Sequence, residues 1–136
     1  MKLEYHIASG DFTSAGKASS QIKQVLKQLQ VDSKTIKRIV VAVYEAEVNV
    51  VAHSHGGTVT ATISGNDIVV EVSDRGPGIA DVEQAMQAGF STATKAVREM
   101  GFGAGMGLPN IKKNVDELRI ESEPGKRTTL VFRVAI

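Results

Sequence analysis

A long segment with helical spacing, residues 36–51, of which 11 of 16 are apolar, constrains the fold of this chain most strongly. Its spacing predicts a helix that begins at an N-cap, either Asp32 or Ser33, and ends near Val51. Because apolar residues occupy nearly all sides of this helix, it has to be buried on several sides. Each polar side chain that it carries therefore needs a partner or a function.

The segments on either side of this helix predict a sheet and further helices. We expect strands over residues 3–7, 58–63, 68–72, 118–123 and 128–136, because apolar and polar residues alternate or β-formers cluster there. The turn at 64–67 favours a hairpin between the second and third of these strands.

Three further helices are expected from apolar spacing and end signals. They cover residues 14–30, a short stretch from Asp81 to Gly89, and a segment with Pro109 in its first turn that carries Leu108, Ile111, Val115 and Leu118. This order of elements predicts an α/β two-layer sandwich of the α+β type, with helices on one face of a mixed, mostly antiparallel sheet.

Composition narrows the function classes. The chain has 136 residues, which suits one domain over residues 1–136, and its 16 Lys+Arg against 15 Asp+Glu give no basic excess for a nucleic-acid partner. It has no cysteine, which excludes disulfides and thiolate metal sites. The longest apolar run, 39–44, is far shorter than the roughly 20 residues of a membrane span, and the start has no signal-peptide character. We therefore expect a cytoplasmic protein without a membrane partner.

The first cluster that could carry chemistry is Glu45, Asn49 and His53, which repeat every four residues on the apolar helix. This spacing places them on one face. They could be solvated where the helix reaches the surface. Alternatively, Glu45 could orient or deprotonate a nucleophile while the Asn49 carbonyl oxygen binds Mg²⁺ beside substrate phosphates. Glu47 falls on the apolar stripe, and the sequence assigns it no role.

The second cluster is the segment 74–79, Asp-Arg-Gly-Pro-Gly-Ile, which comes directly after a strand. Asp74 could accept a hydrogen bond from the exocyclic amine of a ring, while Gly76 and Gly78 let a planar base approach the backbone. The same residues also make an excellent turn, and taken alone they favour that simpler interpretation.

The third cluster is a run of alternating glycines that leads into a helix N-terminus: Gly101, Gly103, Gly105 and Gly107. Such backbone can wrap an anion with its N–H groups. Neither the Walker nor the Rossmann pattern matches, and a flexible hinge is the alternative. Residues 90–107 otherwise show no apolar period, which is typical of a binding loop.

Together, the motifs at 45–49, 74–79 and 105–108 resemble the N box and the two glycine boxes of the GHKL superfamily of ATPases and kinases. The resemblance covers nearly the whole chain. It implies the Bergerat ATP-binding fold, with ATP and Mg²⁺ bound between the helices and a lid over residues 90–104. The segments 89–92 and 108–113 are similar to those of anti-sigma-factor serine kinases, and the stressosome switch kinases are the most similar branch.

The resemblance also implies roles for individual residues. Glu45 would be the catalytic base, Asn49 the Mg²⁺ ligand and Asp74 the residue that recognises adenine. The remaining nucleotide-binding residues would be Gly76, Gly78, Ile79, Lys95, Arg98, Gly101, Gly103, Gly105, Met106, Gly107 and Leu108. Lys95, Arg98 or a partner would neutralise the γ-phosphate, because the arginine that the sporulation kinases carry before the second glycine box is replaced here by Gly103-Ala104.

Two functions follow from the resemblance. The first is an ATP-dependent protein serine/threonine kinase of a bacterial partner-switching pathway, which phosphorylates a STAS-domain antagonist or scaffold protein. The alternative is a nucleotide-gated binding module that sequesters a sigma factor or activates a PP2C-type phosphatase without phosphoryl transfer. Glu45 favours the kinase, because binding alone does not need a carboxylate one turn from the metal ligand.

Overall fold

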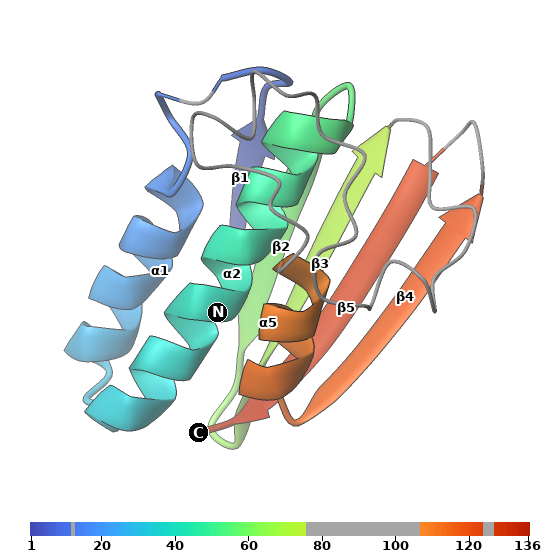
Figure 1. The fold of residues 1–136 in the computed structure, drawn as a ribbon. Coiled ribbons are helices and arrows are strands. Elements are labelled where there is room, and N and C mark those ends of the chain that lie inside the picture. The colour runs from blue at the N-terminus through green and yellow to red at the C-terminus, as the bar shows by residue number, and fades with distance from the viewer. Residues whose placement is uncertain (12, 76–106, 124–126) are drawn as a thin grey trace.

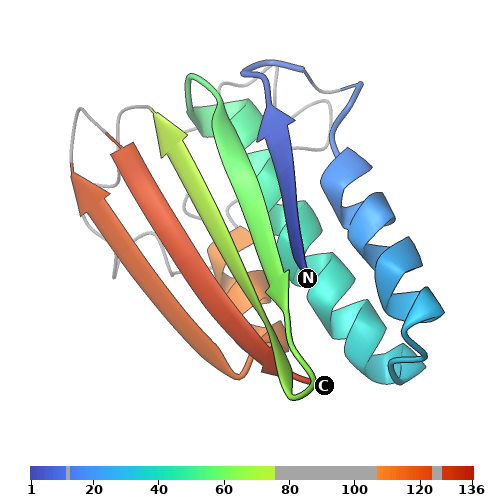
Figure 2. The same cartoon turned by 180° about the vertical axis from the view of Figure 1, so that it is seen from behind.

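The described part of the chain forms a five-stranded antiparallel sheet with three helices on one face, in a computed structural model that describes residues 1–11, 13–75, 107–123 and 127–136. The helices α1 (Lys17–Gln28), α2 (Ser33–His53) and α5 (Gly107–Asn114) lie side by side over the sheet (Figure 1). In the same ranges, the opposite face of the sheet carries no helix (Figure 2). The predicted two-layer sandwich is therefore confirmed.

The sheet has the order β1-β2-β3-β5-β4, and each neighbouring pair is antiparallel. Its strands are β1 (Lys2–Ile7), β2 (Gly57–Ile63), β3 (Asp67–Arg75), β4 (Glu117–Glu123) and β5 (Arg127–Ala135). The predicted turn joins β2 to β3, and it is closed by a hydrogen bond of 2.9 Å from the Ser64 N–H to the Asp67 carbonyl oxygen.

Helix α2 begins at one of the two N-cap residues that the sequence predicts. Asp32 is the N-cap, and its carboxylate accepts a hydrogen bond of 3.3 Å from the Thr35 N–H. By contrast, α1 begins at Lys17 rather than near residue 14, because Gly16 has a left-handed backbone at φ 95°. The left-handed conformation of Gly16 ends the preceding loop, so the helix begins at the next residue.

The last helix is shorter than predicted. It ends at Asn114, so Val115 and Leu118 do not continue its apolar face as expected. The Asp116 N–H donates to the Arg133 carbonyl oxygen at 3.0 Å, which starts the pairing of β4 with β5. Pairing with β5 therefore overrides the helical spacing, and Leu118 packs as a strand residue.

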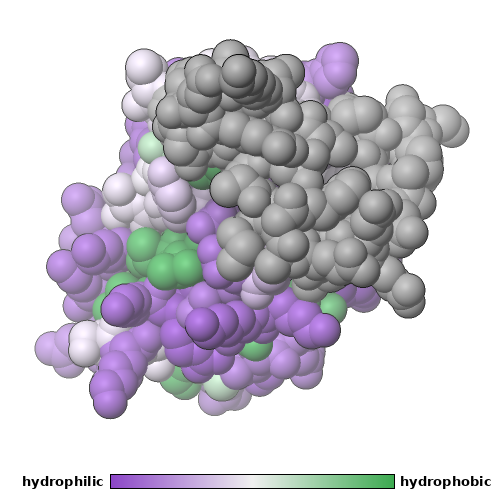
Figure 3. All heavy atoms as spheres, viewed as in Figure 1, coloured by the Kyte–Doolittle hydropathy of each residue, from purple (hydrophilic) through white to green (hydrophobic). Residues whose placement is uncertain are grey.

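The core lies between the helices and the sheet. It joins fully buried residues of α2, such as Ile39 and Val43, to Val70 of β3 and Phe132 of β5. Each such side chain stabilises the fold by about 1.5–3 kcal/mol through removal of apolar surface from water. On the helix side, the visible described surface is mostly polar (Figure 3). Within the described ranges, no helix combines the length and apolarity needed to cross a membrane.

Candidate functional site

Helix α2 faces α5 through two polar contacts. Asn110 of α5 donates from Nδ2 to Oε1 of Glu45 at 3.3 Å. Nearer the start of α2, Arg38 donates from Nε to the Asn114 carbonyl oxygen at 3.0 Å and pairs through Nη2 with Asp116 at 3.0 Å. The earlier residue of α2 thus contacts the later residue of α5. The two helices therefore run antiparallel (Figure 1).

Asn49 lies one turn beyond Glu45 on the same face of α2. The antiparallel arrangement places this turn toward the N-terminal end of α5, where Gly107 begins the helix. Asn49 is half-buried, and its carboxamide makes no side-chain hydrogen bond with the other residues that the structure describes. An amide oxygen in this position can bind a cation that also contacts phosphate at the α5 N-terminus. His53 is the last residue of α2, and its side chain lies outside the described set.

Asp74 occupies the end of β3, on the same face of the strand as buried Val70 and Val72, which is the face that the helices cover. Its Oδ1 accepts a hydrogen bond of 3.0 Å from the Thr128 N–H of β5. Burial raises the pKa of this carboxyl, and the Thr128 hydrogen bond offsets part of the rise. Oδ2 has no hydrogen bond to another described residue, so it could accept from an amine.

Gly57 of β2 lies directly opposite Asp74 in the sheet. A Cβ atom at Gly57 would lie 2.5 Å from the Ser73 carbonyl oxygen and 3.1 Å from the Asp74 Cβ. Only glycine lets the two strands approach this closely beside the Asp74 carboxyl. No local pattern in the sequence marks Gly57, because the strand that it approaches is set by sheet pairing.

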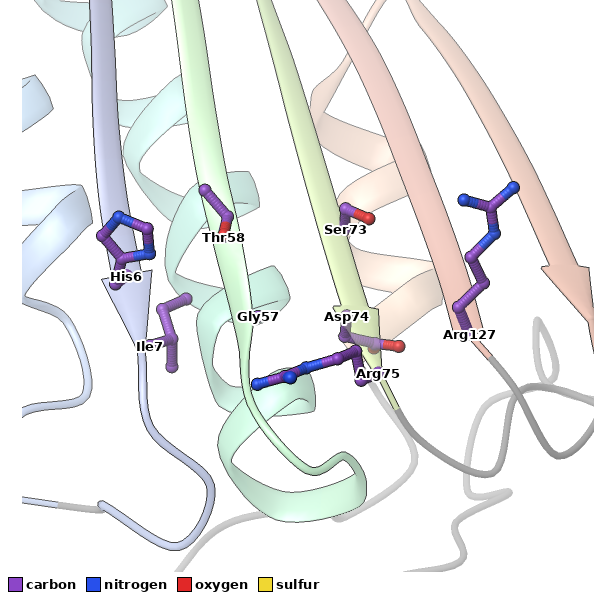
Figure 4. Close-up of a pocket in the computed structure, with 8 residues that line it drawn as sticks. All are labelled: His6, Ile7, Gly57, Thr58, Ser73, Asp74, Arg75 and Arg127. Atoms are coloured by element: carbon purple, nitrogen blue, oxygen red, sulfur yellow. The ribbon is translucent and has the colours of Figure 1, made fainter.

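A hollow of about 570 Å³ opens at this end of the sheet. Figure 4 shows the residues that line it, from the end of β1, the start of β2, the end of β3 and the start of β5. They are His6, Ile7, Gly57, Thr58, Ser73, Asp74, Arg75 and Arg127. Most of these side chains, such as those of Ser73 and Arg75, alternate with Asp74 or its neighbours and lie on the face of the sheet opposite the described helices (Figure 4), so the hollow lies on the other side of the sheet from the Asp74 carboxyl.

The structure shows a structural role for Glu47, to which the sequence assigns none. It is buried, with a relative exposure of 2%, and it accepts backbone hydrogen bonds at the start of α1. Its two oxygens bind the N–H groups of Gly16 at 3.1 Å, Ala18 at 3.2 Å and Ser19 at 2.7 Å. Glu47 thus caps α1 from a different helix and favourably meets the positive end of its dipole.

Of the glycine run, the structure describes Gly107, together with Leu108, which follows it. Gly107 is the first residue of α5, so the glycine run leads into a helix N-terminus as the sequence predicts. The Leu108 side chain packs in the core, which leaves its backbone for contact with a ligand. Their roles in binding remain predictions.

Several predicted features lie outside the described residues. They are the helix at 81–89, the lid at 90–104, and the predicted binding residues Gly76, Gly78, Ile79, Lys95, Arg98, Gly101, Gly103, Gly105 and Met106.

Comparison with known proteins gives a family match over most of the chain. Residues 9–133 match the histidine kinase-like ATPase domain. An anti-sigma F factor of Thermoanaerobacter sp. (strain X514) is 42% identical over 106 residues, which cover 74% of this chain and 71% of that protein. The serine/threonine-protein kinase RsbT of Bacillus subtilis is 29% identical over 112 residues, with coverage of 79% and 78%.

Solved structures share the fold at lower identity. The structure of the RsbU and RsbW domains of Rv1364c from Mycobacterium tuberculosis superposes with a TM-score of 0.64 at 23% identity. The match covers 97% of this chain but only 32% of that one. The SiaB-SiaC complex from Pseudomonas aeruginosa gives a TM-score of 0.56 at 16% identity, with coverage of 98% and 89%.

Proposed function

The chain belongs to the histidine kinase-like ATPase domain family, and we propose that it is an ATP-dependent protein serine/threonine kinase. Its substrate would be a serine or threonine of a STAS-domain protein in a bacterial partner-switching pathway. ATP supplies the phosphoryl group, and the protein supplies binding, orientation and charge stabilisation.

The described residues fit a bound nucleotide. The free oxygen of Asp74 would accept from the exocyclic amine of adenine, while Thr128 holds the other oxygen. Asn49 would give its amide oxygen to Mg²⁺, which needs only one or two protein ligands beside phosphate oxygens. The N–H groups at the start of α5 would face the phosphates.

The position of Glu45 is the observation that most supports kinase activity. It is one turn from Asn49, half-buried, and in contact with α5, the helix that follows the glycine run. A carboxylate at this point would orient the substrate hydroxyl and accept its proton. Lys95, Arg98 or a partner would supply positive charge to the γ-phosphate, because the arginine of the sporulation kinases is replaced in this chain.

The relatives support the pathway and the type of partner. One relative is named a serine/threonine-protein kinase and others are named anti-sigma F factors. One structural neighbour combines RsbU and RsbW domains, and another was solved as a complex of SiaB with SiaC. The anti-sigma names also favour the second candidate, a nucleotide-gated module that binds a sigma factor or a PP2C-type phosphatase and acts in the cytoplasm without phosphoryl transfer.

Phosphoryl transfer is the direct test. The chain would be incubated with Mg²⁺, ATP labelled in its γ-phosphate, and each purified STAS-domain protein encoded by the same genome. The proposal predicts label on a serine or threonine of at least one of them. A chain that binds ATP and a STAS-domain protein but transfers no label would instead be the binding module.

A further inference from the structure

We propose that Asn110 is a positioning residue that holds one oxygen of Glu45, so that the other oxygen faces the substrate hydroxyl. This inference rests on the proposed kinase function. Its basis is the hydrogen bond of 3.3 Å from Asn110 Nδ2 to Glu45 Oε1. Both side chains are half-buried between α2 and α5, so water screens this contact less than it would at the surface.

Glu45 needs such a partner because its side chain is flexible. Glutamate loses up to about 1.5–2 kcal/mol of rotamer entropy when it is fixed. Asn110 is its only side-chain hydrogen-bond partner among the residues that the structure describes. With Oε1 engaged, Oε2 is the oxygen left to act on a substrate.

The backbone at Asn110 is itself tied to α2. The Asn114 Nδ2 donates to the Asn110 carbonyl oxygen at 2.7 Å, and Arg38 donates to the Asn114 carbonyl oxygen at 3.0 Å. Arg38 lies on α2, two turns before Glu45, so the contacts lead from α2 to α5 and back to α2. These contacts hold the backbone that carries Asn110 in place relative to the helix that carries Glu45.

The chemistry of an amide suits this role. Asn110 donates a hydrogen bond without adding a charge, whereas a lysine or arginine there would pair with the carboxylate and compete with the substrate. In the reaction, Glu45 Oε2 accepts the hydroxyl proton while the hydroxyl oxygen bonds to the γ-phosphorus. The β–γ bridging oxygen keeps the electron pair of the broken bond and leaves with ADP.

The test compares variants of the full chain in phosphoryl transfer to the STAS-domain protein that the wild type labels. Asn110→Ala removes the donor, and Asn110→Asp places an acceptor opposite Glu45. Lys112→Ala is the matched control, because Lys112 is exposed on the same helix. We expect both Asn110 variants to lower kcat by about 10- to 100-fold, the range that misplacement of a reacting group produces. The KM for ATP should change less than about threefold, as expected when ground-state binding is kept.

A double-mutant cycle separates positioning from general damage. In a Glu45→Gln background, Asn110→Ala should lower kcat by less than about twofold, because the group that it positions has already lost its function. A full additional loss would show that Asn110 acts on the fold and would overturn the inference. An unchanged kcat in both Asn110 single variants would also overturn it, while leaving the kinase function intact. A wild type that labels no STAS-domain protein would reject the kinase function itself, and the inference with it.

Discussion

Glu45 and Glu47 are two residues apart on α2, yet they bind different helices. Glu45 accepts a hydrogen bond from Asn110 of α5, whereas Glu47 accepts three backbone hydrogen bonds at the start of α1. Helical geometry separates their directions by about 200° at 3.6 residues per turn. One carboxylate is thus available for chemistry, and the other anchors the neighbouring helix.

The first prediction concerns Glu47. Glu47→Ala would leave the N–H groups of Gly16, Ala18 and Ser19 without their acceptor, two of them in buried bonds. We expect the free energy of unfolding to fall by about 2–4 kcal/mol, since each buried donor left unsatisfied costs about 1–3 kcal/mol. Urea denaturation measures the change. Glu45→Ala is the matched control and should cost less than about 1 kcal/mol, because it removes one hydrogen bond of a half-buried group. Equal losses in the two variants would contradict this role for Glu47.

The role of Glu47 could not be predicted from the sequence. The partners of its side chain lie 28 to 31 residues away along the chain, and no periodicity within α2 encodes them. Asn110 and Gly57 were also missed, because each depends on a neighbour set by helix packing or strand pairing. In contrast, the turn at 64–67 and the cap at Asp32, one of two predicted candidates, are confirmed, since their hydrogen bonds close within three residues.

The end of α5 illustrates the same limit. Leu108, Ile111, Val115 and Leu118 have helical spacing, but only the first two lie in the helix. Arg38 binds the carbonyl oxygen of Asn114, and Asp116 accepts from the Ala135 N–H at 2.7 Å. These tertiary contacts end the helix at a residue that local propensity does not mark.

The second prediction concerns nucleotide recognition by Asp74. Asp74→Asn keeps an oxygen for the Thr128 N–H but can present an N–H₂ donor to the adenine amine. We expect ADP to bind about 10- to 100-fold more weakly, because a mismatched buried polar pair costs about 1–3 kcal/mol. Calorimetry with ADP measures the affinity, and Glu71→Gln, exposed on the same strand, is the control. Unchanged ADP affinity in Asp74→Asn would remove Asp74 from the base pocket.

The third prediction is a pH dependence of stability. Burial raises the pKa of Asp74 in the folded protein, so the folded state retains this proton at pH values where the unfolded chain has lost it. The contribution of Asp74 to stability therefore falls as the pH rises from its ordinary pKa of 3.8 through the raised value. Asp74→Asn cannot titrate there.

The stability of Asp74→Asn relative to wild type should increase from acidic to neutral pH without nucleotide. Because both proteins share all their other titrating groups, the difference isolates Asp74. Urea denaturation of the two proteins across this range measures it. A difference that stays constant with pH would contradict the raised pKa.

The fourth prediction concerns the metal. Asn49→Ala should abolish the gain in ATP affinity that Mg²⁺ produces and leave metal-free binding nearly unchanged, because only the oxygen for the cation is lost. Calorimetry with ATP in Mg²⁺ and in EDTA measures both affinities. If the two fall together, Asn49 supports the shape of α2 rather than the metal.

The last prediction separates a kinase from a binding module. Glu45→Gln preserves a carbonyl oxygen that can still accept from Asn110, so the packing of α2 on α5 should persist. It removes the proton acceptor, however, and should lower phosphoryl transfer to the STAS-domain protein by about 10²-fold or more, the scale of losing a general base. ATP affinity should stay within about threefold of wild type, since Glu45 acts on the hydroxyl rather than on the nucleotide. Labelled ATP measures the transfer and calorimetry measures the affinity. Loss of both would indicate damage to the helix, and transfer at the wild-type rate would exclude Glu45 as the base.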